Sequence, residues 1–96
     1  MTKADIVNGI AKKTGIEKVT VHKTVEAFMA TLKGSLTSGK NVYLRRFGSF
    51  VLRKRAEKTA RNISKNTTII IPEHFIPAFK PSKEFVISVK STVKNS

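Results

Sequence analysis

A strongly basic segment, residues 45–66, carries the side chains with the clearest chemical potential in this sequence. It contains eight of the 19 Lys and Arg residues and one acid, Glu57. The only apolar side chains between residues 53 and 66 are Ala56, Ala60 and Ile63. These are too few to bury a core, and clustered guanidinium and ammonium groups bind phosphates well. We interpret the segment as a basic hairpin arm that reaches for a polyanion; a solvated, charged loop is the alternative.

No group of side chains in the sequence resembles a catalytic centre or a metal site. The chain has no Cys, which excludes thiol catalysis and thiolate metal ligands. His22 and His74 are isolated, so structural or surface roles fit them better than metal binding. Ser49, Ser64 and Ser82 lack a neighbouring base or oxyanion motif, and no Gly-rich phosphate loop occurs. We therefore predict a protein that is not an enzyme and that binds no cofactor or metal.

Length and charge restrict the class of protein. The 96 residues make one small domain, and the formal charge of +13 suits nucleic acid, an anionic membrane surface or an acidic partner. No apolar run approaches the roughly 20 residues of a membrane span, and the N-terminus lacks a signal-peptide pattern. We expect a soluble, cytoplasmic protein, and the absence of Cys is compatible with a reducing cytosol.

Two amphipathic helices are predicted to form the base of the arm. The first covers residues 3–14, with Thr2 as N-cap, Asp5 as capping-box partner and Gly15 as the C-terminal residue with positive φ. The second covers residues 18–38. Its apolar positions recur at helical spacing and are Val21, Val25, Phe28, Met29, Leu32 and Leu36. The link between the two helices allows only a tight corner, so they form a helical hairpin.

After the second helix the apolar pattern changes to period two, which is typical of strands. Residues 42–44 alternate in this way, and Phe47-Gly48-Ser49-Phe50 is interpreted as a turn between two aromatic anchors, after which a strand continues. The β-branched residues 67–71 predict the return strand. Three prolines predict an irregular stretch over residues 72–81. Ser82 is expected to cap a C-terminal helix.

The predicted fold class is α+β: a helical hairpin, a three-stranded antiparallel sheet with an extended β-arm, and a C-terminal helix. A core built from the roughly 75 residues outside the arm stabilises a domain weakly, so a twofold-related copy is expected to add burial. The residues expected in the shared core are Val25, Phe28, Met29, Leu32, Leu36, Leu44, Phe47, Phe50 and Phe79. The three Phe of this set could also form a base-stacking platform, but their apolar neighbours favour the core.

Four motifs give the chain a resemblance to a known family. They are Phe47-Gly48-Ser49-Phe50, Arg55-Ala56-Glu57, Arg61-Asn62 and Pro77-Ala78-Phe79. With Lys3, Gly39 and Lys83, they resemble the bacterial histone-like DNA-binding proteins, the HU and integration host factor family, over essentially the whole chain. The resemblance implies an intertwined dimer with a helical body, a β-sheet saddle and two arms that enter the DNA minor groove and bend the duplex. The single domain then divides into a helical dimerisation body (1–40), the sheet and DNA-binding arm (41–79) and a C-terminal helix (80–96).

The arm tip matches the family motif in part. Arg61 and Asn62 match, Ala60 stands where the family has glycine, and Lys65-Asn66 stands where it has Thr-Gly. Ile63 occupies the position of the family's wedge proline. Because isoleucine is also apolar, Ile63 is the predicted DNA-intercalating wedge. Packing of Ile63 on its own hairpin is the alternative.

The residues predicted to bind DNA lie on the arm and its flanks. They are Lys3, Arg46, Arg53, Lys54, Arg55, Lys58, Arg61, Asn62, Ile63, Lys65, Lys80 and Lys83. For Lys3 and Lys83, an ordinary solvated lysine is equally compatible with the sequence.

The expected partner is double-stranded DNA, bound with weak sequence specificity because minor-groove edges carry little base information. We expect a nucleoid-associated homodimer, with a heterodimer containing a paralogue as the alternative. An RNA-binding or ribosome-associated protein is the alternative function. Membrane binding is disfavoured because the apolar helix faces are needed for the core.

Overall fold

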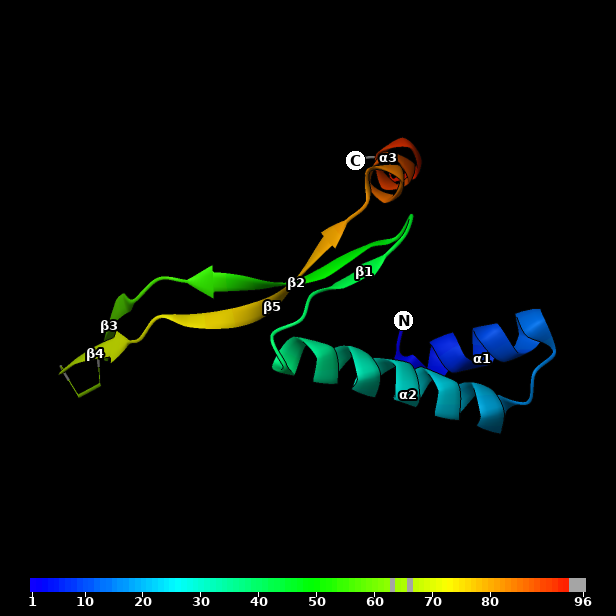
Figure 1. The fold of residues 1–96 in the computed structure, drawn as a ribbon, viewed down its shortest axis with the longest axis horizontal. Coiled ribbons are helices and arrows are strands. Elements are labelled where there is room, and N and C mark those ends of the chain that lie inside the picture. The colour runs from blue at the N-terminus through cyan, green and yellow to red at the C-terminus, as the bar shows by residue number, and fades with distance from the viewer. Residues whose placement is uncertain (63, 66, 94–96) are drawn as a thin grey trace.

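The structure, a computed structural model, describes residues 1–62, 64, 65 and 67–93. Its elements in chain order are α1 (Lys3–Thr14), α2 (Lys18–Thr37), β1 (Val42–Leu44), β2 (Gly48–Arg55), β3 (Lys58–Asn62), β4 (Thr67–Ile71), β5 (His74–Pro81) and α3 (Lys83–Thr92). The predicted α+β fold is confirmed (Figure 1). The Cα radius of gyration is 18.9 Å, whereas a compact domain of this length has one of about 13 Å. The chain is therefore strongly elongated.

The helical hairpin formed by α1 and α2 follows local sequence signals closely. The Thr2 backbone N–H donates to Asp5 Oδ2 over 2.9 Å, and the Asp5 N–H donates to Thr2 Oγ1 over 3.3 Å, so the predicted capping box is present. Gly15 ends α1 with φ 75°, a conformation that glycine adopts without a Cβ penalty. The helices pack on each other through Val7 and Val21, which are the buried apolar residues among those described.

The three-stranded sheet has the antiparallel order β1-β2-β5. The return strand predicted at residues 67–71 is present as β4, but it pairs with β3 and does not belong to the three-stranded sheet. The prediction of an irregular stretch over residues 72–81 was wrong, because residues 74–81 form β5 and pair with β2 along their whole length. Prolines fit here since β5 is an edge strand. Leu52, opposite Pro77, donates its backbone N–H to Asn41 Oδ1 over 3.0 Å, away from β5, so this position needs no donor from Pro77.

The connection between β1 and β2 is displaced from the predicted turn at residues 47–50. Residues 45–47 form the turn, with Arg46 at φ 68°, and Gly48 already pairs in β2. Gly48 is needed for close approach and not for turning. A Cβ built on Gly48 would lie 2.6 Å from the Lys80 carbonyl oxygen and 2.7 Å from ring atoms of Phe79.

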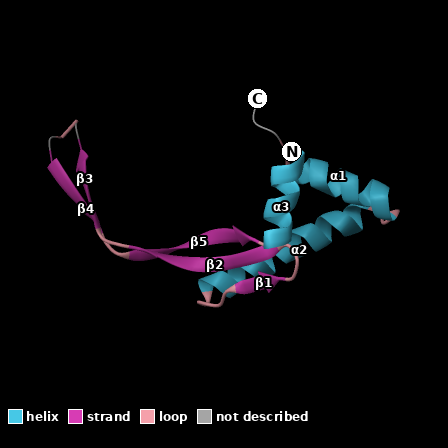
Figure 2. Cartoon of the chain, turned by 90° about the horizontal axis from the view of Figure 1, so that it is seen from above, coloured by secondary structure: helices cyan, strands magenta, loops and turns pink. Residues whose placement is uncertain are grey.

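The arm extends from the far end of the β2–β5 ribbon as a second, two-stranded sheet. Strands β3 and β4 pair antiparallel from Lys58↔Ile71 to Asn62↔Thr67, which confirms the predicted basic hairpin. Figure 2 shows it projecting well away from the helices. The predicted wedge, Ile63, lies outside the described residues, as do Asn66 and residues 94–96.

The C-terminal helix α3 is attached at the opposite end of this ribbon from the arm. Ser82 caps it as predicted, since its hydroxyl accepts from the Phe85 N–H over 3.2 Å and donates to the Arg46 carbonyl over 3.0 Å. The Phe85 ring lies 5.4 Å from Phe47, and Phe79 lies 4.9 Å from Phe50 and 5.2 Å from Phe47, centroid to centroid. These four rings form an aromatic cluster that joins α3 to the sheet.

Much of the apolar surface of the single chain is uncovered. Phe28 is 48% exposed, Met29 40%, Phe47 46% and Phe79 38%. The remaining residues of the predicted shared core are half-buried: Val25, Leu32, Leu36, Leu44 and Phe50. No helix among the described residues is long and apolar enough to cross a membrane.

Candidate nucleic-acid interface

The two faces of the three-stranded sheet differ in chemistry, and strand register determines which residue lies on which face. Cross-strand partners share a face, and alternate residues along a strand share it too. Val42, Phe50 and Phe79 form one row, with Leu52 and Pro77 in a neighbouring row. These apolar residues define one face of the sheet, the face that carries the aromatic rings.

The opposite face is basic and polar, and we call it the basic face. One row across its three strands contains Tyr43, Ser49 and Lys80. Arg53 and Arg55 continue the face along β2 toward the arm. The register thus places cations from two strands and two hydroxyl groups on one face, where the apolar pair Val51–Ala78 separates the Ser49 row from Arg53. Phosphate oxygens accept hydrogen bonds from all of these cationic and hydroxyl side chains.

At the end of the sheet near α3, the basic face widens into a shallow groove of about 500 Å³. Its lining includes Tyr43, Ser49 and Lys80, together with Arg45 and Arg46 from the β1–β2 turn. The left-handed backbone at Arg46 turns the chain here, and the Arg46 carbonyl accepts from Ser82. The start of α3, which carries Lys83, is therefore fixed beside the turn that carries the two arginines.

The arm carries cations on both of its faces. Lys58 pairs with Ile71, whereas Arg61 pairs with Thr68, and residues three apart along a strand point to opposite faces. Arg61 is part of strand β3. Lys65 lies in the turn that follows it, within the described part of the tip. Asn62 closes the β3–β4 pairing with its backbone.

Two of the predicted contact residues lie neither on the basic face with its groove nor on the arm. Lys54 lies on the apolar-face side of β2, between Arg53 and Arg55, and its Nζ pairs with Glu73 over 3.1 Å. Lys3 lies on α1 and forms an ion pair with Glu26 of α2.

The Lys3–Glu26 pair links the two helices of the hairpin. The Lys3 ammonium hydrogen-bonds Glu26 and lowers the pKa of this carboxyl group. His22 Nε2 lies 3.7 Å from the same Glu26 oxygen. Lys3 therefore has an intramolecular anionic partner that any external phosphate must displace.

Sequence reasoning missed four residues of the basic surface: Tyr43, Arg45, Ser49 and His74. The period-two pattern around Leu44 already placed Tyr43 and Arg45 on the polar side of a strand. The pattern did not show which residues of the neighbouring strands lie opposite Tyr43 and Arg45. Ser49 was assigned to a turn and His74 to an irregular stretch, so neither could be placed on a face.

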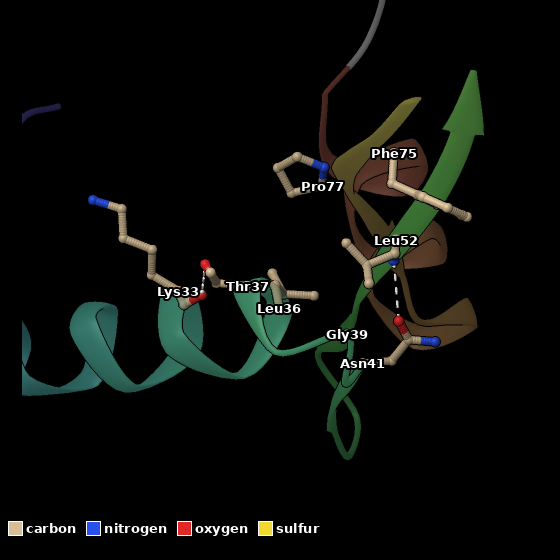
Figure 3. A pocket seen from close by; sticks show the side chains of 8 residues that line it. All are labelled: Lys33, Leu36, Thr37, Gly39, Asn41, Leu52, Phe75 and Pro77. Atoms are coloured by element: carbon tan, nitrogen blue, oxygen red, sulfur yellow. Dashed lines mark hydrogen bonds between the residues drawn. The ribbon is translucent and has the colours of Figure 1, made fainter. Parts of the chain in front are cut away.

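A groove with a volume of about 770 Å³ lies on the apolar face. Leu52, Phe75 and Pro77 approach it from the sheet, and Leu36 approaches it from α2 (Figure 3). Its lining lacks acidic groups, and the described residues contain no cluster of three potential metal ligands. The groove offers mainly apolar contact surface with Lys33 at its lining, whereas Arg53, Arg55 and Lys80 lie on the opposite face of the sheet.

Comparison with known proteins gives concordant matches. The family described as bacterial DNA-binding protein matches residues 1–90. HU from Thermus thermophilus is 39% identical over 90 residues, which cover 94% of this chain and 93% of the relative. The beta subunit of integration host factor from Marinobacter nauticus is 36% identical over 95 residues, covering 98% and 97%.

Solved structures of such proteins have the same fold. The cocrystal structure of Anabaena HU with DNA matches with a TM-score of 0.88 and 32% identity, covering 94% of this chain and 98% of that one. HU from Thermotoga maritima matches with a TM-score of 0.67 and 26% identity, covering 94% and 100%.

Proposed function

The chain belongs to the bacterial DNA-binding protein family that includes HU and integration host factor, and we propose that it is an architectural protein that binds duplex DNA and bends it. The observation that carries this proposal is that the basic face has arginines at the end from which the basic arm extends. Arg53 and Arg55 lie on the sheet at the point where the β2–β5 ribbon passes into β3 and β4. In this role the chain is not an enzyme and is associated with the nucleoid.

The basic face and the arm differ in shape and charge, so we assign them different contacts with DNA. The basic face and its groove meet phosphates, with Arg46, Arg53, Arg55, Lys80 and Lys83 as donors. The arm, with Lys58, Arg61, Asn62 and Lys65, follows the minor groove, where the negative potential is strongest over narrow A·T segments. Phosphate contacts fix the position of a protein without reading sequence. Sequence specificity is therefore weak, and the deformability of the duplex matters more.

Ile63 at the arm tip acts as a wedge in this proposal. An apolar side chain inserted between base pairs unstacks them at a cost of a few kcal/mol and kinks the duplex. The bend then brings the flanking DNA toward the lysines at the sides of the body. Lys83 is fixed there by the Ser82 cap, whereas Lys3 must first leave Glu26.

The functional unit is an intertwined homodimer in this proposal, with residues 1–40 as the dimerisation body, residues 41–79 as sheet and arm, and residues 80–96 as the C-terminal part, which contains the end of β5 and α3. The exposed Phe28 and Met29 on α2 and the apolar groove beside Leu36 support a second copy. Each fully buried large apolar side chain contributes about 1.5–3 kcal/mol. Association should therefore make the melting temperature rise with protein concentration. A concentration-independent melting temperature together with a monomeric mass in sedimentation would contradict the dimer.

Competition between nucleic acids tests the function itself. A labelled duplex DNA is bound at moderate salt and challenged with unlabelled duplex or with structured RNA of equal phosphate content. We expect the duplex to be the better competitor, because a ribbon fits the minor groove of B-DNA. Better competition by RNA would favour an RNA-binding or ribosome-associated protein instead.

A further inference from the structure

His74 occupies a position on the basic face that its residue type alone did not suggest. It is the first residue of β5 and lies directly opposite Arg55, the last residue of β2. Cross-strand partners share a face, so the imidazole lies on the same face as Arg53 and Arg55. This is the place where the sheet passes into the arm.

A hydrogen bond determines which ring nitrogen of His74 is available. Nδ1 lies 2.9 Å from the Pro72 carbonyl oxygen. A carbonyl oxygen only accepts, so Nδ1 must carry the hydrogen in this contact. Nε2 is then the nitrogen that gains a second proton, and it has no hydrogen-bond partner among the residues that the structure describes.

The charged groups around His74 do not neutralise an imidazolium. Arg55 faces it from β2 and is also positively charged. The adjacent acid, Glu73, is paired with Lys54 over 3.1 Å, and Lys54 belongs to the other face of β2. An imidazolium here therefore has no ion pair with an acidic side chain of the described residues, and an incoming phosphate would be its anionic partner.

We propose that His74 is a DNA contact that binds a backbone phosphate through Nε2 and takes up a proton from solvent when the complex forms. This inference rests on the proposed function and adds a ligand residue to the same surface. The proton goes to Nε2, the phosphate oxygen accepts the new N–H, and no covalent bond changes. Arg55 and His74 together then form a two-strand clamp on the phosphates at the base of the arm.

Proton uptake makes DNA affinity depend on pH in a defined direction. Histidine ordinarily changes charge near pH 6.5, and a neighbouring phosphate favours the charged form. Binding therefore strengthens as the pH falls through the neutral range. If the phosphate shifts the protonation equilibrium tenfold, affinity rises by up to about tenfold per contacting subunit. Each added phosphate contact also steepens the salt dependence of the logarithm of affinity by about 0.9.

The experiment measures the affinity of the full-length protein for a fluorescent duplex between pH 5.5 and 7.5 at several salt concentrations. The variants are His74→Asn, whose amide can still donate to the Pro72 carbonyl, and His74→Lys, which keeps a positive charge throughout. The matched control is His22→Gln, because His22 is the other histidine of the chain and lies on α2 beside Glu26. Circular dichroism verifies that each variant is folded.

We expect wild type and His22→Gln to bind more tightly and with a steeper salt slope at pH 5.5 than at pH 7.5. His74→Asn should lose both changes, and His74→Lys should bind tightly with no dependence on pH in this range. An unchanged pH dependence in His74→Asn, or a wild type whose affinity does not vary with pH, would overturn the inference. Failure to bind duplex at any pH would instead contradict the proposed function.

Discussion

Substitution of Gly48 by alanine tests how the basic face is held in place. Gly48 is buried in β2 between Leu44 and Pro81. A Cβ there would lie 2.6 Å from the Lys80 carbonyl oxygen and 2.7 Å from Phe79 Cε1 and Cζ. A Cβ atom essentially never lies this close to a non-bonded carbon or oxygen atom, so β5 and the Phe79 ring would both have to move. The Phe79 ring is itself held at 4.9 Å from Phe50, so it has little room to rotate away.

The net effect of Gly48→Ala is the difference between two terms. Overpacking of this kind typically destabilises a protein by about 1–3 kcal/mol. A new methyl group also lowers the conformational entropy of the unfolded chain. This stabilises the folded state by about 0.4–1 kcal/mol where the native backbone conformation is compatible with alanine. The φ of Gly48 is not positive, so that gain applies. We expect a net loss of about 1–2 kcal/mol, or a melting temperature lower by roughly 4–16 °C for a domain of this size.

Thermal and urea unfolding followed by circular dichroism measure this loss. The control is Gly9→Ala, because Gly9 lies inside α1 and a Cβ there meets nothing within 4 Å. Alanine is favoured over glycine inside a helix by roughly 0.5–1 kcal/mol, so the control should be more stable than wild type. If Gly48→Ala were as stable as Gly9→Ala, the close approach of β5 to β2 described above would be refuted. We also expect weaker DNA binding by Gly48→Ala, because Lys80 moves with its carbonyl.

Three further perturbations address the arm and the helical body. Arg55→Ala should weaken binding to most duplexes and reduce the salt slope in salt titrations by about one unit per contacting subunit. Lys13→Ala removes an equal charge from α1 and should leave the slope nearly unchanged. An equal effect of both substitutions would mean that net charge matters and not a specific Arg55 contact. Ile63→Ala should reduce the bend angle measured by energy transfer more than it reduces affinity for unbent duplex, and an unchanged angle would remove the wedge role. Lys3 lowers the pKa of Glu26 below its ordinary value of 4.5. Their ion pair therefore contributes its full stability above pH 4.5, and this stability is lost as the pH falls through the lowered pKa of Glu26. In thermal melts Glu26→Gln should lose this part of the acid sensitivity, and identical acid profiles for both proteins would contradict the assignment.

Local signals in the sequence were sufficient for the helices and their ends. The Thr2–Asp5 capping box, the Gly15 cap bond to Ala11 and the acceptance of the Phe85 N–H by Ser82 all join residues within four positions of one another. Such contacts depend mainly on the local sequence. The arm was also predictable, since a long basic segment with few apolar residues has no core to join.

Features that depend on pairing between distant residues were not predictable. The prolines at 77 and 81 argued against a strand, but they occupy edge positions whose N–H groups the sheet does not use. Glycine at position 48 suggested a turn, yet its role is set by Phe79, which lies far away in sequence. The row Tyr43–Ser49–Lys80 and the pair Arg55–His74 exist only because of the register. Periodicity reveals which residues of one strand share a face, but it does not reveal their neighbours on the next strand.

Bending of duplex DNA by the wild-type protein tests the central claim most directly. Donor and acceptor dyes are attached to the two ends of a duplex of a few tens of base pairs, and energy transfer is followed as protein is added. We predict a saturable rise in transfer efficiency, larger on a duplex with a nick at its centre, since such a site bends with less deformation energy. Binding that saturates in anisotropy while transfer efficiency stays at the value of free DNA would show a protein that binds DNA without bending it, and would contradict this account.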